Sequence, residues 1–198
     1  MSNDDDTTLV ERAQQGADEA FGQLVQRYQD RIYRLVRRIV GDAEAEDALQ
    51  ETFLSAWRAL PRFKGDAAFS TWIYRIATNA ALMRLRKRRP DVVSLDAPLR
   101  DAEGAETAGA QEIRDWSATP DEDLINDETR VAMEKAIAEL PDDWRVAFML
   151  RDVEEMSNAD AAAALDLSVP AFKARVHRAR LFLRDRLDRH FGTTSRSA

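Results

Sequence analysis

Apolar residues recur every three or four positions along most of the chain, a spacing that is typical of helices with one buried face. One such pattern begins at Asp18 and ends at Gly41, and a second covers about residues 43–60. Alternating β-branched residues and hairpin dipeptides such as Asn-Gly are absent from the sequence. The pattern therefore predicts an all-α protein.

A stretch without this periodicity separates two helical parts of the chain. Residues 91–127 contain two prolines and two glycines, and their 11 acidic and 2 basic residues give them a charge of −9. Residues 1–90 carry +2 and residues 128–198 carry 0, so the net charge of −7 arises in this stretch. Such a composition is typical of a flexible segment. We expect two small helical domains, 1–90 and 128–198, joined by an acidic flexible linker.

The helix predicted over about residues 43–60 has an apolar side chain on its polar face. Leu54 lies there among polar and charged residues, namely Asp47, Gln50, Glu51 and Arg58. An apolar centre with a charged rim is typical of a surface that docks on another protein. A solvated face with one exposed leucine fits the same spacing, so the periodicity leaves both interpretations open.

The segment 70–90 begins with aromatic residues and ends with basic ones. A turn at Gly65 precedes it, and Ser70 or Thr71 is expected to cap its helix. Five basic residues lie between positions 84 and 89. Helices often carry arginines for solubility, so this pattern does not by itself define a function.

The second domain contains a short helix, a brief turn and a longer basic helix, which is the helix-turn-helix pattern. Ser157 and Asp160 form a capping box for the first of these helices, and Ser168 caps the second. Asp166 stands in the turn, where it tolerates the left-handed backbone conformation better than most residues. We therefore expect a four-helix domain with a helix-turn-helix.

The longer helix carries a positive ridge, and its stretch 173–184 has no acidic residue. The ridge consists of Lys173, His177, Arg180 and Arg184, with Arg175 and Arg178 on the other flank. A solvated basic face is the plain alternative, but soluble helices usually mix both signs of charge. We therefore interpret this helix as one that reads the major groove of DNA.

Composition argues against several other classes of protein. The chain has no cysteine, which excludes disulfides and thiolate metal sites. Its acidic, polar start does not fit a signal peptide. No stretch approaches the roughly 18 apolar residues of a membrane helix. We expect a cytoplasmic protein without membrane insertion.

Motifs of enzymes are not evident. The acidic residues of the 43–60 helix spread around it without a histidine partner, and His177 and His190 lack metal-ligand spacing. No phosphate loop, nucleophile elbow or dinucleotide fingerprint occurs. We expect no intrinsic catalysis, no cofactor and no metal. A stand-alone helix-turn-helix regulator remains an alternative, although no segment for the dimerisation that such regulators use is evident.

Three motifs in a fixed order resemble one family. DALQETF and FSTWIYRIATN lie in the first helical part, and VHRAR lies in the basic helix. Together they resemble the bacterial RNA polymerase sigma factors of the extracytoplasmic-function (ECF) type, with the second conserved region in 1–90 and the fourth in 128–198. The resemblance implies a subunit that binds core RNA polymerase and directs promoter-specific transcription initiation, in a stress or envelope response.

The resemblance also implies roles for individual residues. The set that matches the helix docking on the clamp coiled coil of the polymerase largest subunit is Asp47, Gln50, Glu51 and Leu54. The set that matches contacts to the non-template strand of the −10 element is Ala59, Phe63, Lys64, Ser70, Trp72, Asn79, Arg84 and Arg86. The set that matches contacts to bases or phosphates of the −35 element is Lys173, Ala174, Arg175, His177, Arg178, Arg180 and Arg184. Pro170 and Ala174 depart from the family's usual Gly and frequent Ser.

These implied roles agree with the chemistry of the segment 70–90. Aromatic rings stack on unpaired bases of any sequence, and arginines attract phosphates. Melting DNA costs about 1.4 kcal/mol per base-pair step, so a captured base offsets part of that cost. The resemblance further implies promoter DNA and an anti-sigma factor as partners, and such a factor can hold the protein at the membrane.

Overall fold

Helices form the whole of the regular structure in the computed structural model, which describes residues 3–88 and 127–194, with side chains for 5–88 and 129–189. The helices before the gap are α1 (Asn3–Gln14), α2 (Asp18–Val40), α3 (Asp42–Ala59), the 3₁₀ turn η1 (Leu60–Arg62) and α4 (Phe69–Arg88). Those after it are α5 (Asp127–Ala138), α6 (Asp142–Phe148), the π-helical turn η2 (Met149–Val153), α7 (Asn158–Ala164) and α8 (Val169–Thr194). The predicted all-α class is confirmed. The linker expected over 91–127 lies outside the described residues except for Asp127, where α5 begins.

The first domain follows the sequence pattern in α2 and α3 and departs from it at two places. Gly41 separates the two helices with a φ of 88°, a conformation that glycine adopts without strain. The helix α1 was not predicted. The predicted cap of α4 is wrong, because the amide of Trp72 donates to the carbonyl of Ala68 (3.1 Å) and the helix begins at Phe69. Ser70 therefore lies inside the first turn.

The helix-turn-helix of the second domain has the predicted local geometry. The Ser157 hydroxyl accepts a hydrogen bond from the Asp160 amide (3.0 Å), and the Ser168 hydroxyl accepts one from the Ala171 amide (3.3 Å). Asp166 has a φ of 56°, in the left-handed region expected for the turn. Before this motif, the short α6 continues directly into the π-helical turn η2, which ends at Val153.

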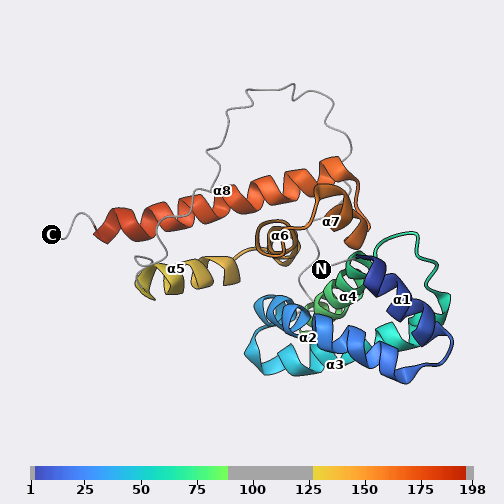
Figure 1. Ribbon diagram of the computed structural model, residues 1–198. Coiled ribbons are helices and arrows are strands. Elements are labelled where there is room, and N and C mark those ends of the chain that lie inside the picture. The colour runs from blue at the N-terminus through green and yellow to red at the C-terminus, as the bar shows by residue number, and fades with distance from the viewer. Residues whose placement is uncertain (1–2, 89–126, 195–198) are drawn as a thin grey trace.

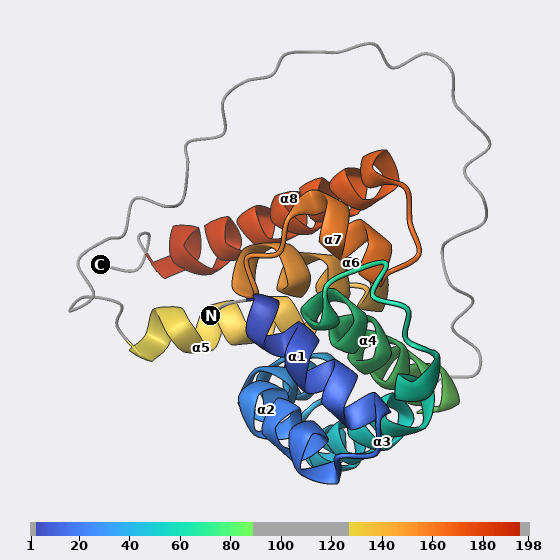
Figure 2. The ribbon, with the colours of Figure 1, turned by 45° about the vertical axis from the view of Figure 1, so that its right-hand side comes forward.

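The two domains pack against each other through α4, α6 and α7 (Figures 1 and 2). Their buried residues form a continuous apolar cluster that includes Leu24 and Ile73 of the first domain and Leu150 and Phe172 of the second. α8 runs along the far side of the second domain, with α6 and α7 between it and the first. The cluster therefore fixes the relative orientation of the two domains in this arrangement.

Arg145 of α6 binds carbonyl groups at the ends of two other helices, α2 and α5. The residue is 8% exposed, and its guanidinium donates to the carbonyl of Ile39 at the end of α2 (2.9 Å). It also donates to the carbonyls of Ile137 (3.1 Å) and Ala138 (2.8 Å) at the end of α5, and to that of Leu140 (2.7 Å) just beyond it. A cation at the C-terminal ends of helices is favourable, because carbonyls without an intrahelical partner gather there.

Candidate functional site

The polar face of α3 has an exposed leucine in a shallow hollow. Leu54 is 54% exposed. The hollow has a volume of about 250 Å³, and its lining consists of Asp47, Gln50, Glu51, Leu54, Ser55, Arg58 and Arg84. All the residues expected to dock on the polymerase thus lie together, around one apolar side chain. This is the geometry of an apolar centre with a charged rim.

Arg84 belongs to this hollow, although the sequence grouped it with the basic tail of α4. Its guanidinium lies 3.1 Å from Glu51, 3.5 Å from Asp47 and 3.9 Å from Glu44. Arg88, one turn further on, also approaches Glu44 at 3.8 Å. α4 therefore presents these arginines to the carboxylates of α3. Arg89, the last basic residue of the tail, lies outside the described residues.

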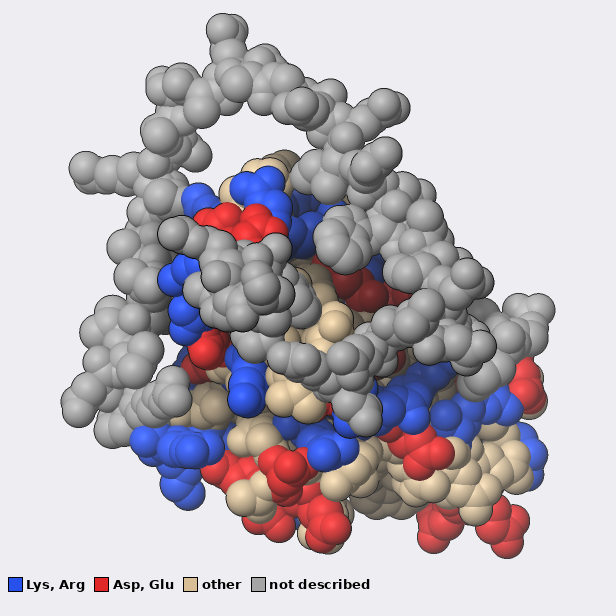
Figure 3. Space-filling view, turned by 90° about the vertical axis from the view of Figure 1, so that its left-hand side faces the viewer, with Lys and Arg blue, Asp and Glu red and all other residues tan. Residues whose placement is uncertain are grey.

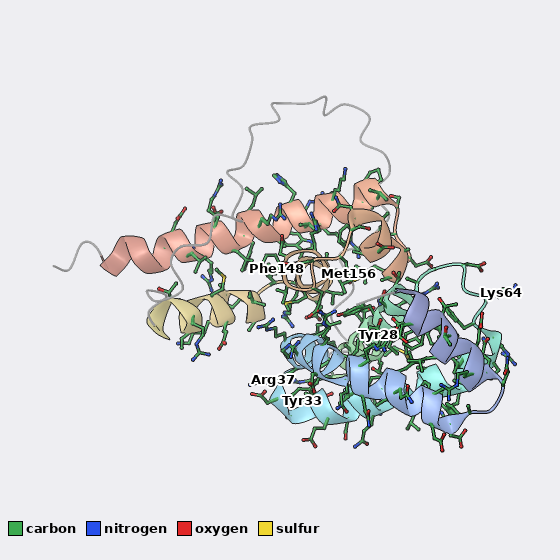
Figure 4. The ribbon with its side chains drawn as sticks, in the orientation of Figure 1. Tyr28, Tyr33, Arg37, Lys64, Phe148 and Met156 are labelled. Carbon is green, nitrogen blue, oxygen red and sulfur yellow. The ribbon has the colours of Figure 1, made fainter. Side chains whose placement is uncertain are left out.

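A second cavity lies at the loop between α3 and α4. It has a volume of about 320 Å³, and the loop lines it from Phe63 to Phe69. α1 contributes further lining residues, which are Thr7, Val10, Glu11 and Gln14. Lys64 projects from the outer edge of this loop (Figure 4). The loop of Phe63 and Lys64, which the resemblance links to the −10 strand, thus borders a cavity of which another wall is α1.

Aromatic rings fill the inner side of this loop. The Phe63 ring lies 4.8 Å from that of Trp72 and 6.2 Å from that of Phe69, and Phe69 lies 5.4 Å from Tyr28. Trp72 is therefore half-buried in an aromatic cluster, and only part of its ring faces solvent. Sequence reasoning treated it as a ring that is free to stack on a base.

The other expected −10 residues differ in exposure. Asn79 and Arg86 are exposed on α4. Ser70 and Ala59 are half-buried, at the start of α4 and the end of α3. Arg86 therefore remains with Lys87 in an exposed basic stretch at the end of α4.

The expected −35 residues from Lys173 to Arg178 lie in the first half of α8. Lys173, Ala174, His177 and Arg178 are exposed, and Arg175 is half-buried. Their common exposure on one helix is the arrangement that groove contact requires.

Two arginines further along α8 have acidic neighbours. Arg180 donates to the carboxylate of Asp152, with its Nε at 3.2 Å. This hydrogen bond raises the pKa of the Arg180 guanidinium. Arg184 lies 3.8 Å from Asp185. In Figure 3, which views the molecule from the left-hand side of Figure 1, the Lys and Arg side chains of the described residues are interspersed with Asp and Glu.

Two absences hold for the described part of the chain. Within residues 5–88 and 129–189, no three His, Asp or Glu side chains lie close enough together to hold a metal ion. No helix among the described ones is long and apolar enough to cross a membrane.

Comparisons with known proteins assign the chain to a class. The model of sigma-70 region 2 matches residues 24–90, and that of sigma-70 region 4 matches residues 130–183. These are the two helical parts that carry the surfaces described above, and the chain is therefore of the sigma-70 type. The matched regions leave out α1.

Whole-chain relatives define the family within that class. The chain is 40% identical over 178 residues to the ECF RNA polymerase sigma-E factor of Escherichia coli K12, covering 88% of this chain and 90% of the relative. It is 40% identical over 183 residues to the RNA polymerase sigma-H factor of Pseudomonas aeruginosa, covering 91% and 92%. The chain belongs to the ECF RNA polymerase sigma factors, non-catalytic subunits through which RNA polymerase recognises promoters. The resemblance seen in the sequence is confirmed.

Solved structures with the same fold are complexes. CnrH bound to the cytosolic domain of CnrY matches with a TM-score of 0.66 and 27% identity, covering 93% of this chain and 97% of that one. The sigma factor RpoE bound to the anti-sigma factor NepR from Bartonella quintana matches with a TM-score of 0.60 and 25% identity, covering 85% and 96%.

Proposed function

We propose that the chain docks on the clamp coiled coil of core RNA polymerase through the hollow around Leu54. The observation that supports this most directly is an apolar side chain, 54% exposed, at the centre of a charged rim on α3. An exposed leucine does not contribute to the fold in this position, whereas burial against a partner would remove its apolar surface from water. Membership of the sigma-factor family supports core polymerase as that partner.

We also propose how the two domains divide promoter recognition. The loop Phe63–Phe69 and the exposed face of α4 bind the melted −10 strand, and the exposed start of α8 binds the −35 element. Support comes from the cavity at the loop, from the basic end of α4 and from the exposed Lys173 and Arg178 on α8. The domain limits 1–90 and 128–198 belong to the same proposal.

An anti-sigma factor is the proposed inhibitor. The support is that a structural relative, RpoE, is in complex with one. A subunit of bacterial RNA polymerase acts where the chromosome lies, so the proposed location is the cytoplasm. A stand-alone regulator would bind DNA without polymerase, and affinity for core polymerase distinguishes the two.

The test replaces Leu54 with aspartate and measures binding to core polymerase by fluorescence anisotropy. We expect Leu54→Asp to weaken binding by about 10- to 100-fold, because a charge enters an apolar contact and each tenfold corresponds to about 1.4 kcal/mol. Val131→Asp is the matched control, since Val131 is an exposed apolar residue of α5 (40%) outside the hollow.

Circular dichroism melts of both variants should match the wild type. In vitro transcription from a genomic fragment library, followed by sequencing of the RNA 5′ ends, identifies the promoters used. Leu54→Asp should abolish transcription from these promoters, and Val131→Asp should not. Unchanged polymerase affinity of a folded Leu54→Asp variant would show that the hollow is not the docking surface.

A further inference from the structure

The last residue of α1 holds the loop that borders the larger cavity. The side-chain amide of Gln14 donates to the carbonyl of Leu60 (2.9 Å) and to the carbonyl of Phe63 (2.8 Å). These carbonyls lie 46 and 49 positions further along the chain. The amide nitrogen of glutamine has two protons, and here each has a backbone acceptor. Gln14 thus fixes the point at which the chain leaves η1 and enters the loop.

α1 is itself attached firmly to α2. The Arg27 guanidinium pairs with the carboxylates of Asp5 and Asp6, and the Tyr28 hydroxyl donates to Asp6. Asp6 is 5% exposed and Tyr28 4%, so their hydrogen bond is buried, whereas the pair of Arg27 with Asp5 lies at the surface. The Tyr28 ring also packs edge-on against Phe69 at the other end of the loop. α1, α2 and both ends of the loop are therefore one connected unit.

We propose that α1 is a wall of the −10 base-reading site and that Gln14 is a positioning residue for base discrimination there. This inference rests on the function proposed above, in which the loop takes up a base of the melted strand. The cavity supports it directly, because α1 supplies Val10, Glu11 and Gln14 to its lining, together with the loop residues.

Discrimination between bases depends on how precisely the loop is held. A base is read through hydrogen bonds to its exposed edge, and these require donors and acceptors at fixed places. The loop from Phe63 to Ala68 contains no helix or strand of its own. Its conformation therefore depends on anchors from outside, of which Gln14 is one. Phosphate attraction, by contrast, tolerates movement because it acts at longer range.

The test uses holoenzyme assembled from core polymerase and the full chain. Gln14→Met keeps the length of the side chain and removes both donors, and Gln15→Met is the matched control at the adjacent exposed residue. The probe is a promoter library with every base at each −10 position of the non-template strand, and a second library is varied in the −35 element. Bound DNA is sequenced, and the relative affinity for each base is calculated.

We expect Gln14→Met to reduce the preference at one −10 position by about tenfold, the size of one lost base-reading contact. Affinity for core polymerase and preferences within the −35 element should stay as in the wild type. Gln15→Met should change none of these ratios. Gln14→Arg restores N–H donors at this position and should recover part of the preference. Its added charge raises the affinity for every library member alike, so it does not affect the ratio of affinities for different bases.

Two outcomes would overturn the inference in different ways. A uniform loss of affinity for all library members, or an unchanged pattern of base preference with Gln14→Met, would show that Gln14 has only a structural role. A wild-type holoenzyme without any preference in the −10 element would overturn the proposed function as well. The wild-type measurement thus separates failure of the function from failure of this assignment.

Discussion

The hydroxyl of Tyr74 on α4 donates a hydrogen bond to the carboxylate of Glu154, which lies 80 positions further along the chain in the second domain. Nearby, the Thr71 hydroxyl lies 3.4 Å from a carboxylate oxygen of Asp160 on α7. Tyr74 is 4% exposed, so the contact belongs to the buried boundary between the domains. The helix proposed to bind the −10 strand is thus held against the helix-turn-helix.

This packed arrangement is too compact for binding to both promoter elements. Elements centred at −10 and −35 lie about 25 base pairs apart, which corresponds to roughly 85 Å of duplex. α7 contacts both α4 and α8. Packed helices have axes about 8–10 Å apart, so the two proposed reading surfaces are separated by little more than one helix. Binding to a promoter therefore requires the domains to separate.

The first prediction follows from that geometry. Tyr74→Phe removes the donor to Glu154, and hydrogen bonds to charged groups contribute about 1.5–3 kcal/mol. The variant should therefore shift the equilibrium between packed and separated domains at least about tenfold toward the separated state. Because the chain has no cysteine, Asp30→Cys on α2 and Asp188→Cys on α8 provide unique, exposed sites for a fluorescent donor and acceptor outside the proposed DNA-binding residues.

Energy transfer between these labels is the measurement. Energy transfer in the free chain should be lower for Tyr74→Phe than for the wild type. For every variant, it should be lower still in holoenzyme bound to a promoter. Tyr33→Phe is the control, since Tyr33 lies on α2 at the far side from α7 (Figure 4). Equal transfer in the free and promoter-bound chain would contradict the prediction.

The second prediction concerns stability at alkaline pH. Burial, and then hydrogen bonding to a carboxylate, raises the pKa of Tyr28 beside Asp6 and of Tyr74 beside Glu154. An unfolded tyrosine has a pKa near 10. Their folded-state pKa values are raised, so these tyrosines contribute no pH dependence well below pH 10 and destabilise the fold as the pH rises above it.

Urea unfolding at a series of pH values tests this. The wild type should lose free energy of unfolding between about pH 9 and pH 11, where the unfolded tyrosines ionise. Tyr28→Phe combined with Tyr74→Phe should start with a lower stability and lose less over that range. Parallel curves for the wild type and the double variant would show that neither tyrosine is the source of the pH dependence.

The third prediction separates two arginines that the sequence placed in one basic tail. Arg84 pairs with Glu51 and Asp47, and its side chain is 25% exposed. Arg84→Ala should weaken binding to core polymerase by about 3- to 10-fold through loss of carboxylate positioning. Its effect on the free energy of unfolding should be under about 1 kcal/mol, as for other partly exposed ion pairs.

Arg86→Ala is the matched comparison, because Arg86 is exposed two residues further along α4. It should instead weaken binding to single-stranded −10 DNA and reduce the salt dependence of that binding by about one phosphate contact. Anisotropy titrations with polymerase and with DNA measure both affinities for each variant. If Arg84→Ala and Arg86→Ala lost equal affinity for polymerase and equal affinity for DNA, the distinction between the two arginines would be refuted.

Helical periodicity predicted the elements whose apolar faces are long and regular. It located the limits of α2 at Asp18 and Gly41, and the turn at Asp166, because local chemistry determines those positions. α1 was missed, since its first residues are mostly acidic. Its place depends on Asp6 meeting Arg27 and Tyr28, which are distant in sequence. Gln14 could not be recognised without that helix.

The sequence indicated which residues group into each candidate surface, but it assigned some individual residues to the wrong group. Leu54 and its polar neighbours were grouped correctly, because one helix carries them. Arg84 was grouped by proximity in sequence, although its spacing of four from Arg88 places both on one side of α4. That spacing could have indicated a common partner, which is Glu44.

The last prediction concerns how α8 divides base reading from phosphate contact. Lys173 and Arg178 are exposed in its first half, near the turn of the helix-turn-helix, where recognition helices contact base edges. Lys173→Ala and Arg178→Ala should each cost about 1–3 kcal/mol on a specific −35 element and much less on random DNA. Arg184 lies farther along the helix, so Arg184→Ala should weaken binding to all sequences alike and flatten the salt dependence. Titrations of specific and random duplexes at several salt concentrations measure both quantities. If all three variants lost the same affinity on both duplexes, α8 would bind DNA through its charge alone, and the assignment of reading residues would be wrong.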